Sequence, residues 1–187
     1  MSKTWKEAQE LCRQRADVYR LFASLFDREV TAETAEKIAS LKETSAQGDM
    51  SDTGERMIAS GFTGMAEGLE GFDSEIETEL AVDYARVFLN AGKYEGQAAI
   101  PYESYYTSEE HLLMQDARDE VRAWYRKNDV MPPHHNSGFT GDTPDDYVSF
   151  ELGFMAILND RIADALAVGK LSEAIEDAKR AKEFLPA

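Results

Sequence analysis

The chain has 187 residues, of which 43% are hydrophobic, and this suits one domain that buries a sizeable core. Its 20 basic and 36 acidic residues give a net charge of −16, which disfavours nucleic acid and anionic lipid as partners. A single cysteine, Cys12, excludes an intramolecular disulfide and a thiol-rich metal site. The charged N-terminus is unlike a secretory signal, and no stretch has the roughly 20 apolar residues of a membrane span. We therefore expect a cytoplasmic protein without an integral membrane segment.

Helical patterns dominate the first half of the chain. Apolar residues with helical spacing predict helices over residues 4–26 and 31–41. A third helix, over residues 52–70, contains four glycines, each costing about 1 kcal/mol relative to alanine in a helix interior. That helix is therefore expected to be short, broken or closely packed. A fourth helix begins at Asp73 or Ser74, either of which can cap it, and ends near residues 90–92.

The second half continues the helical pattern around one long loop. A helix is expected over residues 108–127, with Leu112, Leu113 and Tyr125 among its buried side chains. Residues 128–144 are rich in proline, glycine and polar groups, which predicts a mobile loop that borders a binding site. Two more helices are expected, one from Pro144 to about Val168 and one over residues 172–184. Without a convincing strand pair, the fold class is all-α, a single-domain helical bundle over residues 1–187.

The stretch PYESYYTSEEH, residues 101–111, places three tyrosines around one carboxylate, Glu103, behind a proline. Tyrosines this dense either fill a core or form a contact surface. Tyrosine suits a contact surface because it offers a large face and a hydroxyl with few torsions to freeze. We interpret PYESYY as a contact surface with a partly buried back, where Tyr105 or Tyr106 packs inward; the all-core alternative stays open.

Some chemistry is absent and some is weakly indicated. The phosphate-loop motifs, zinc-type Cys/His spacing and the Glu-x-x-His pair of di-iron bundles do not occur. A divalent metal could use the loop residues His134, His135 and Asp142, although adjacent histidines on an extended loop usually point apart. An ordinary solvated loop is the favoured interpretation. We expect no catalytic residue, no metal and no bound cofactor.

The acidic residues before and within the late helix need separate explanations. Asp145 and Asp146 fit a helix first turn, where the macrodipole favours acids. Glu151 does not fit this explanation, because it lies inside the apolar run VSFELGFMAIL, one turn from Tyr147. Glu151 is therefore expected either to pair with a cation or to meet a partner.

Three motifs together resemble one known family. The chain has DYARVFLNAG on one helix, then PYESYY, then a loop that ends in TPDDYVSFELGFM. In this order they resemble the TorD/DmsD/NarJ family of cytoplasmic redox-enzyme maturation chaperones, and the resemblance extends over nearly the whole chain. It implies an all-helical fold, no enzymatic activity and binding to an apo-oxidoreductase, often a molybdenum enzyme. Such chaperones often bind the client's twin-arginine signal peptide and delay export until the cofactor is inserted.

The resemblance also implies which residues bind the client. The family pattern places them at Tyr84, Pro101, Tyr102, Glu103, Ser104, Tyr106, Asp146 and Tyr147. Tyr147 departs from the pattern, because many relatives have histidine there, so the resemblance implies no role for imidazole protonation at this position. A twin-arginine signal has a basic head and an apolar middle, so carboxylates and apolar surface suit it. On that ground Glu151 joins the predicted site.

A second departure is the end of the chain. The family pattern continues into a His-Leu and tryptophan motif and further helices, whereas this sequence stops at KEFLPA. The chain is either truncated or a short variant without closing helices. In both cases Phe154, Leu158 and Leu166 include side chains that would lack cover, and exposed apolar surface promotes association. A homodimer is therefore an expected partner state.

Two other function classes are kept as alternatives. One is a metal-dependent hydrolase that uses His134, His135 and Asp142, which a metal titration would detect. The other is a structural adaptor without a peptide groove, for which no cleft should lie near Tyr102 and Asp146. The sequence does not name the client enzyme.

Overall fold

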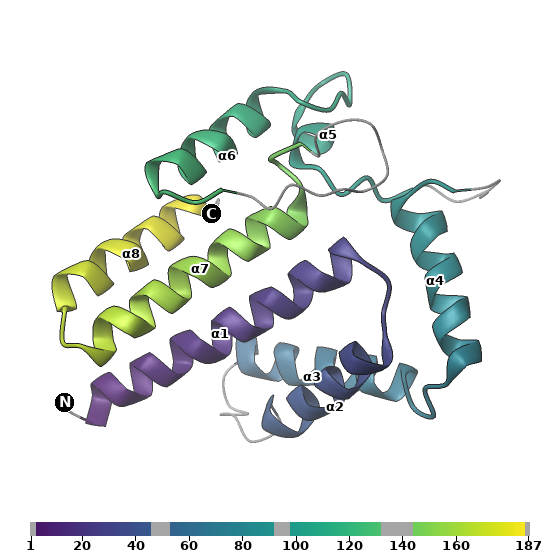
Figure 1. Ribbon diagram of the computed structural model, residues 1–187, viewed down its shortest axis with the longest axis horizontal. Coiled ribbons are helices and arrows are strands. Elements are labelled where there is room, and N and C mark those ends of the chain that lie inside the picture. Colours follow the sequence, from purple (N-terminus) through teal and green to yellow (C-terminus); the bar gives the residue numbers. More distant parts are fainter. Residues whose placement is uncertain (1–2, 46–52, 92–97, 132–143, 186–187) are drawn as a thin grey trace. The chain divides into compact units, whose positions relative to one another are not determined.

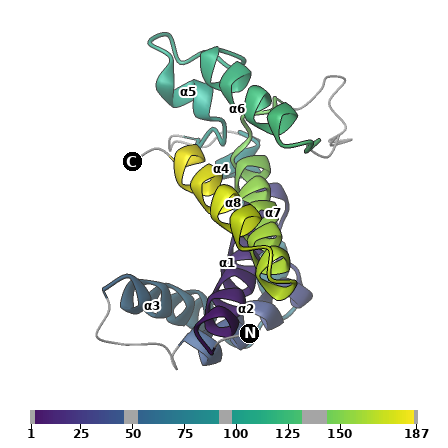
Figure 2. The same ribbon diagram turned by 90° about the vertical axis from the view of Figure 1, so that its left-hand side faces the viewer.

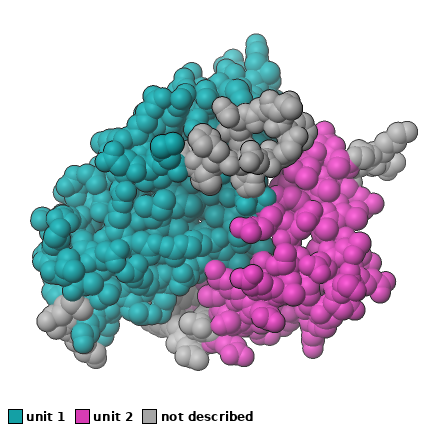
Figure 3. All heavy atoms as spheres, in the orientation of Figure 1, with its two compact units in different colours: residues 1–27, 100–187 teal, residues 28–99 magenta. Residues whose placement is uncertain are grey.

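The computed structural model describes residues 3–45, 53–91, 98–131 and 144–185, and the described residues form helices joined by turns (Figure 1). The all-α prediction is confirmed. The chain divides into two compact units, residues 1–27 with 100–187 and residues 28–99, which Figure 3 colours separately. In the described part of the chain, no helix is long and apolar enough to cross a membrane.

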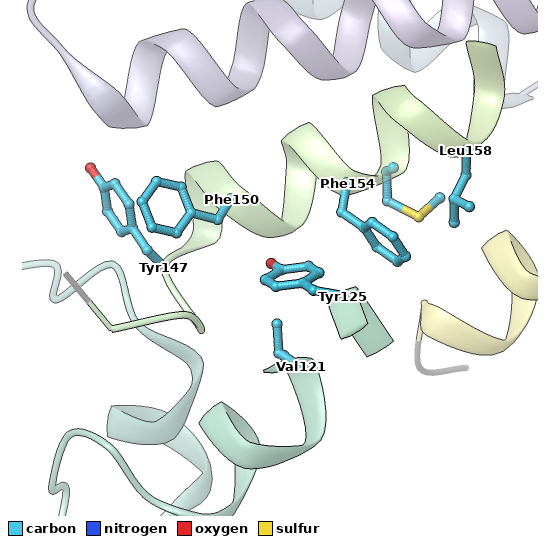
Figure 4. Packing of buried hydrophobic residues seen from close by; sticks show 7 residues of the cluster. Val121, Tyr125, Tyr147, Phe150, Phe154 and Leu158 are labelled. Carbon is cyan, nitrogen blue, oxygen red and sulfur yellow. The ribbon is translucent and has the colours of Figure 1, made fainter. Parts of the chain in front are cut away.

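The first unit is built around helix α7 (Val148–Ala167). Helices α1 (Lys3–Asp27) and α8 (Leu171–Phe184) run along α7, as the two ribbon views show (Figures 1 and 2). Helix α7 is buried on most sides because its sequence is apolar almost all round, as expected of a central helix. Helix α6 (Asp116–Lys127) also reaches this core, since the rings of Tyr125 and Phe154 lie 5.2 Å apart (Figure 4).

The expectation that apolar side chains over residues 147–184 lack cover is wrong for the three that were singled out. Phe154, Leu158 and Leu166 are only 1%, 0% and 7% exposed. Phe184 of α8 covers Phe154 with a ring-centroid distance of 4.8 Å. These side chains therefore give no reason for association, and the homodimer stays a prediction.

Charged side chains fasten α1 to α7 on the outside of this core. The carboxylate of Asp160 on α7 pairs with Arg13 through one oxygen, at 2.8 Å, and with Arg20 through the other. Arg13 also pairs with Asp164. One α7 carboxylate thus bridges two arginines that lie seven positions apart on α1, which fixes the register between the helices.

The second unit contains α2 (Ala32–Ser45), α3 (Thr53–Gly68) and α4 (Ser74–Phe88). Asp73 caps α4 as predicted, because its carboxylate accepts hydrogen bonds from the backbone of Glu75 and Ile76 at 2.9 and 3.0 Å. Helix α3 is continuous over 16 residues, so of the three expected alternatives the broken helix is excluded. Close packing does not explain its glycines either, because a Cβ at Gly61 or Gly64 would meet nothing within 4 Å.

Two predicted helix starts are corrected in the first unit. The helix expected from Ser108 begins only at Asp116, because the backbone of His111 and Met114 has positive φ angles of 53° and 60°. A separate short helix, α5 (Glu103–Thr107), precedes this turn region. The helix expected from Pro144 begins at Val148.

Candidate functional site

The two motifs that the sequence singled out are hydrogen-bonded to each other. Tyr102 and Tyr147 form an isolated antiparallel bridge. The backbone N–H of Val148 donates to the carbonyl oxygen of Pro101 at 3.0 Å, and the N–H of Glu103 donates to that of Asp146 at 3.1 Å. Segments far apart in sequence are thereby held side by side at the start of both α5 and α7.

Asp146 is a buried cap for α5. Its Oδ2 atom accepts a hydrogen bond from the backbone N–H of Ser104 at 2.8 Å, and its side chain is 0% exposed. The interpretation of Asp146 as a first-turn acid of the late helix is wrong, because that residue precedes α7 and serves α5 instead. Because Asp146 is buried, its observed role is to hold α5 in place. Direct contact between Asp146 and a client stays a prediction. Its Oδ1 atom and the Oγ atom of Ser104 are also buried, and neither has a hydrogen-bond partner among the described residues.

The neighbouring acid has a different position. Asp145 is half-buried and forms an ion pair with Arg118 of α6, at 3.2 Å between Nε and Oδ2. The backbone carbonyl of Asp145 accepts a hydrogen bond from the hydroxyl of Tyr125 at 3.3 Å. The guanidinium of Arg118 is thus already paired with the carboxylate of Asp145.

The tyrosines pass from core to surface along the site. Tyr147 is 8% exposed and packs against Tyr102 and Phe150 at 5.2 and 5.3 Å between ring centroids, and Figure 4 shows it beside Phe150. Its hydroxyl donates a hydrogen bond to the carbonyl of Phe26 on α1. Tyr102 is half-buried, whereas Tyr106 is 62% exposed. The stretch PYESYY therefore has a buried back and an exposed end.

Glu103, Asp146 and Glu151 form an acidic cluster around this frame. Glu151 is half-buried, and its Oε1 atom has no hydrogen-bond partner in the described chain. Burial, with the charges of Glu103 and Asp146, raises the pKa of Glu151 from 4.5 to about 8. Burial, followed by the charges of Asp146 and Glu120, also raises the pKa of Glu103. A cation placed here would relieve this repulsion.

The cluster differs from a metal site. In the described ranges, no group of three or more His, Cys, Asp or Glu side chains could hold a metal ion. The loop residues proposed for a hydrolase, His134, His135 and Asp142, lie outside the described residues. The predicted mobile loop, residues 128–144, also lies outside the described residues, apart from residues 128–131 and 144.

One predicted site residue belongs to the other unit. Tyr84 lies on α4, half-buried, with its ring 5.2 Å from that of Phe88. Its grouping with Tyr102 and Glu151 stays a prediction, because the two units are described separately.

A small apolar pocket of about 200 Å³ lies elsewhere in the first unit. Side chains of α1, α7 and the end of α6 line it, among them Ala23, Tyr125, Phe150 and Ile157. It includes none of the residues that the sequence predicted to bind a client.

The described fold is all-helical, and the two paired motifs are among those that resemble the TorD/DmsD/NarJ family. The model of the nitrate reductase delta subunit family matches residues 27–185, and the chain belongs to this family. Among curated relatives, the chaperone protein TorD of Aliivibrio salmonicida (strain LFI1238) is 29% identical over 147 residues. The alignment covers 78% of this chain and 64% of the relative.

A second relative is the chaperone protein TorD of Vibrio vulnificus (strain YJ016), which is 27% identical over 127 residues. That alignment covers 67% of this chain and 57% of the relative. The chain thus spans about three fifths of the length of these relatives. No solved structure matches the chain.

Proposed function

We propose that the chain is a non-enzymatic chaperone for the maturation of a redox enzyme. It binds the twin-arginine signal peptide of an apo-oxidoreductase, of the molybdenum-containing class, and holds the client until its cofactor is inserted. This action before export implies a cytoplasmic location. The names of the curated relatives support the chaperone class, since both are TorD chaperones.

One observation carries the assignment of the site: among the described residues, no cation neutralises Glu103 or Glu151, although both lie beside half-exposed tyrosine surface. Carboxylates favour the planar, bidentate fork of arginine, and an entering guanidinium would also satisfy the free Oε1 atom of Glu151. We assign direct peptide contact to Tyr102, Glu103 and Glu151.

The other residues of the predicted site have supporting roles in this proposal. Pro101, Ser104, Asp146 and Tyr147 hold α5 and α7 together through the backbone contacts and the buried cap. Tyr106 extends the contact surface outward, because its ring is 62% exposed. A metal-dependent hydrolase has no specific observation in its favour among the described residues. The adaptor alternative has one, because the apolar pocket described above includes neither Tyr102 nor Asp146.

The test uses a fluorescent synthetic peptide with two consecutive arginines followed by an apolar middle. Glu151→Gln should weaken binding about tenfold, because it removes a partly desolvated partner of arginine. Tyr102→Ala should weaken binding more than Asp146→Asn, because Tyr102 offers apolar area whereas Asp146 is buried. Glu183→Gln, an exposed acid on α8, is the matched control and should bind like the parent.

The salt dependence of the same titration separates charge from apolar contact. Glu103→Gln should flatten the fall in affinity between low and high salt, because salt screens exposed charge. Tyr102→Ala should leave that fall nearly unchanged. If both variants and the Glu151 variant bind like the parent, this surface is not the peptide site.

A further inference from the structure

Three consecutive large apolar side chains are exposed just after α5. Leu112, Leu113 and Met114 are 47%, 40% and 52% exposed. Single exposed apolar residues are ordinary, but a contiguous apolar run at a surface is typical of an interaction site. The prediction that Leu112 and Leu113 are buried is therefore wrong.

The segment that carries this patch is held in a defined shape by its own hydrogen bonds. The Oγ atom of Ser108 accepts from the backbone N–H of Leu112 at 2.8 Å, and the Nε2 atom of Gln115 donates to the carbonyl of Leu113 at 2.9 Å. His111 and Met114 have left-handed backbones, a conformation that is unfavourable for residues other than glycine. The hydrogen bonds of this segment therefore hold the three apolar side chains at the surface although two backbone conformations are unfavourable.

The patch is joined to the candidate peptide site through α5. The ring of Tyr105 lies 5.2 Å from that of His111, whose Nδ1 atom is 2.9 Å from the Tyr105 carbonyl oxygen. Helix α5 has five residues and is therefore about 7.5 Å long, a length that about two extended residues cover. A peptide with its basic head at Glu103 can thus place later residues near the patch.

Charge indicates which occupant fits. Exposed acids flank the apolar run on both sides, namely Glu109, Glu110, Asp116 and Asp119. A second copy of this chain would bring the same acids to the contact, and like charges would oppose it. An apolar segment of a basic peptide has the complementary character.

We propose that Leu112, Leu113 and Met114 bind the apolar middle segment of the same peptide whose arginines bind at Glu103 and Glu151. This inference rests on the proposed function and adds to it a second subsite, specific for apolar residues. With this subsite, the affinity for the peptide depends directly on the length and hydrophobicity of the segment after the arginines.

The experiment crosses two peptides with two protein variants. One peptide has two arginines followed by about ten apolar residues, and the other has serine and glycine in place of the apolar residues. The test variant is Leu112→Ser/Leu113→Ser/Met114→Ser. The control variant, Val168→Ser/Ile175→Ser, removes apolar side chains that are 69% and 48% exposed in α7–α8. Circular dichroism and urea unfolding check that both variants fold.

The test variant should bind the apolar peptide about tenfold more weakly than the parent and bind the serine–glycine peptide with unchanged affinity. The control variant should match the parent for both peptides. The docking surface is overturned if the test variant keeps the parent's affinity for the apolar peptide, or if it loses both peptides equally. A parent chain that binds neither peptide refutes the proposed function as well as this subsite.

Discussion

Asp146 and Ser104 are joined across 42 positions of sequence by a buried hydrogen bond of 2.8 Å from the serine N–H to the aspartate Oδ2. The bond attaches the first turn of α5 to the residue that leads into α7. An acid that looks like a surface contact in the sequence therefore serves to position α5. This difference determines how its variants should behave.

Asp146→Ala should lower the free energy of unfolding by about 1–2 kcal/mol, because the N–H of Ser104 loses its acceptor in a buried place. Asp146→Asn keeps a side-chain oxygen that can accept the same hydrogen bond, and it should stay within about 0.5 kcal/mol of the parent. Urea unfolding followed by circular dichroism measures both. Equal losses in the two variants would contradict the capping role.

The tyrosine at position 147 is expected to stabilise the contact between α7 and α1. Tyr147→Phe removes the hydrogen bond to the Phe26 carbonyl and should cost about 1 kcal/mol of unfolding free energy. Tyr106→Phe is the matched control, because its ring is 62% exposed, and it should change stability by less than about 0.5 kcal/mol. A Tyr147 variant as stable as the Tyr106 variant would show that the hydroxyl contributes nothing.

The sequence predicted the helical elements well where hydrophobic spacing and caps agree. Asp73 caps α4 as expected, and the last helix begins at Leu171, within one residue of its predicted start. The start of α6 could not be predicted, because an apolar pattern over residues 112–125 fits one helix as well as a turn followed by a helix. The left-handed backbones of His111 and Met114 decide between them, and neither residue type indicates such a turn by itself.

For the site as well, local sequence patterns predict some features, whereas others depend on contacts between distant residues. The family resemblance predicts that PYESYY and the Asp146–Tyr147 pair belong to one site. In the structure, backbone hydrogen bonds join these two motifs. The burial of the site residues could not be predicted from local sequence patterns. It depends on long-range contacts, such as the hydrogen bond between Tyr147 and Phe26 across 121 positions. The role of Asp146 as a cap for a helix 42 positions earlier was hidden for the same reason.

Glu151 should make stability fall as the pH rises. Its pKa is about 8 in the folded chain against 4.5 for an ordinary glutamate, so the folded state binds a proton more tightly than the unfolded state. The stabilising contribution is complete below pH 4.5 and is lost as the pH rises toward 8. Glu151→Gln cannot ionise and should exceed the parent by about 1–3 kcal/mol at pH 8, with little difference at pH 4.5.

Urea unfolding of the parent and the Glu151 variant at pH 4.5, 6, 7 and 8 checks this prediction. Glu183→Gln, an exposed acid of α8, should follow the parent at every pH. A constant difference between Glu151→Gln and the parent across this range would show that Glu151 does not titrate differently in the folded chain.

Peptide binding should release a proton from Glu151 if the arginine of the proposed client meets this carboxylate. A nearby guanidinium favours the ionised form and lowers the pKa from about 8. Between the lowered pKa and 8, the free chain holds a proton that the complex lacks, so affinity should rise with pH. We expect a rise of about tenfold between pH 6 and pH 8 for a peptide without histidine and with a blocked N-terminus.

Calorimetry at pH 7 in two buffers with different ionisation enthalpies measures the release directly. The parent should give different apparent binding enthalpies in the two buffers, whereas Glu151→Gln should give nearly equal ones. His111→Gln should behave like the parent, and it is the control at the C-terminal end of α5, where the Nδ1 atom of His111 lies 2.9 Å from the Tyr105 carbonyl oxygen. Equal enthalpies for the parent in both buffers, together with measurable binding, would place the arginine away from Glu151.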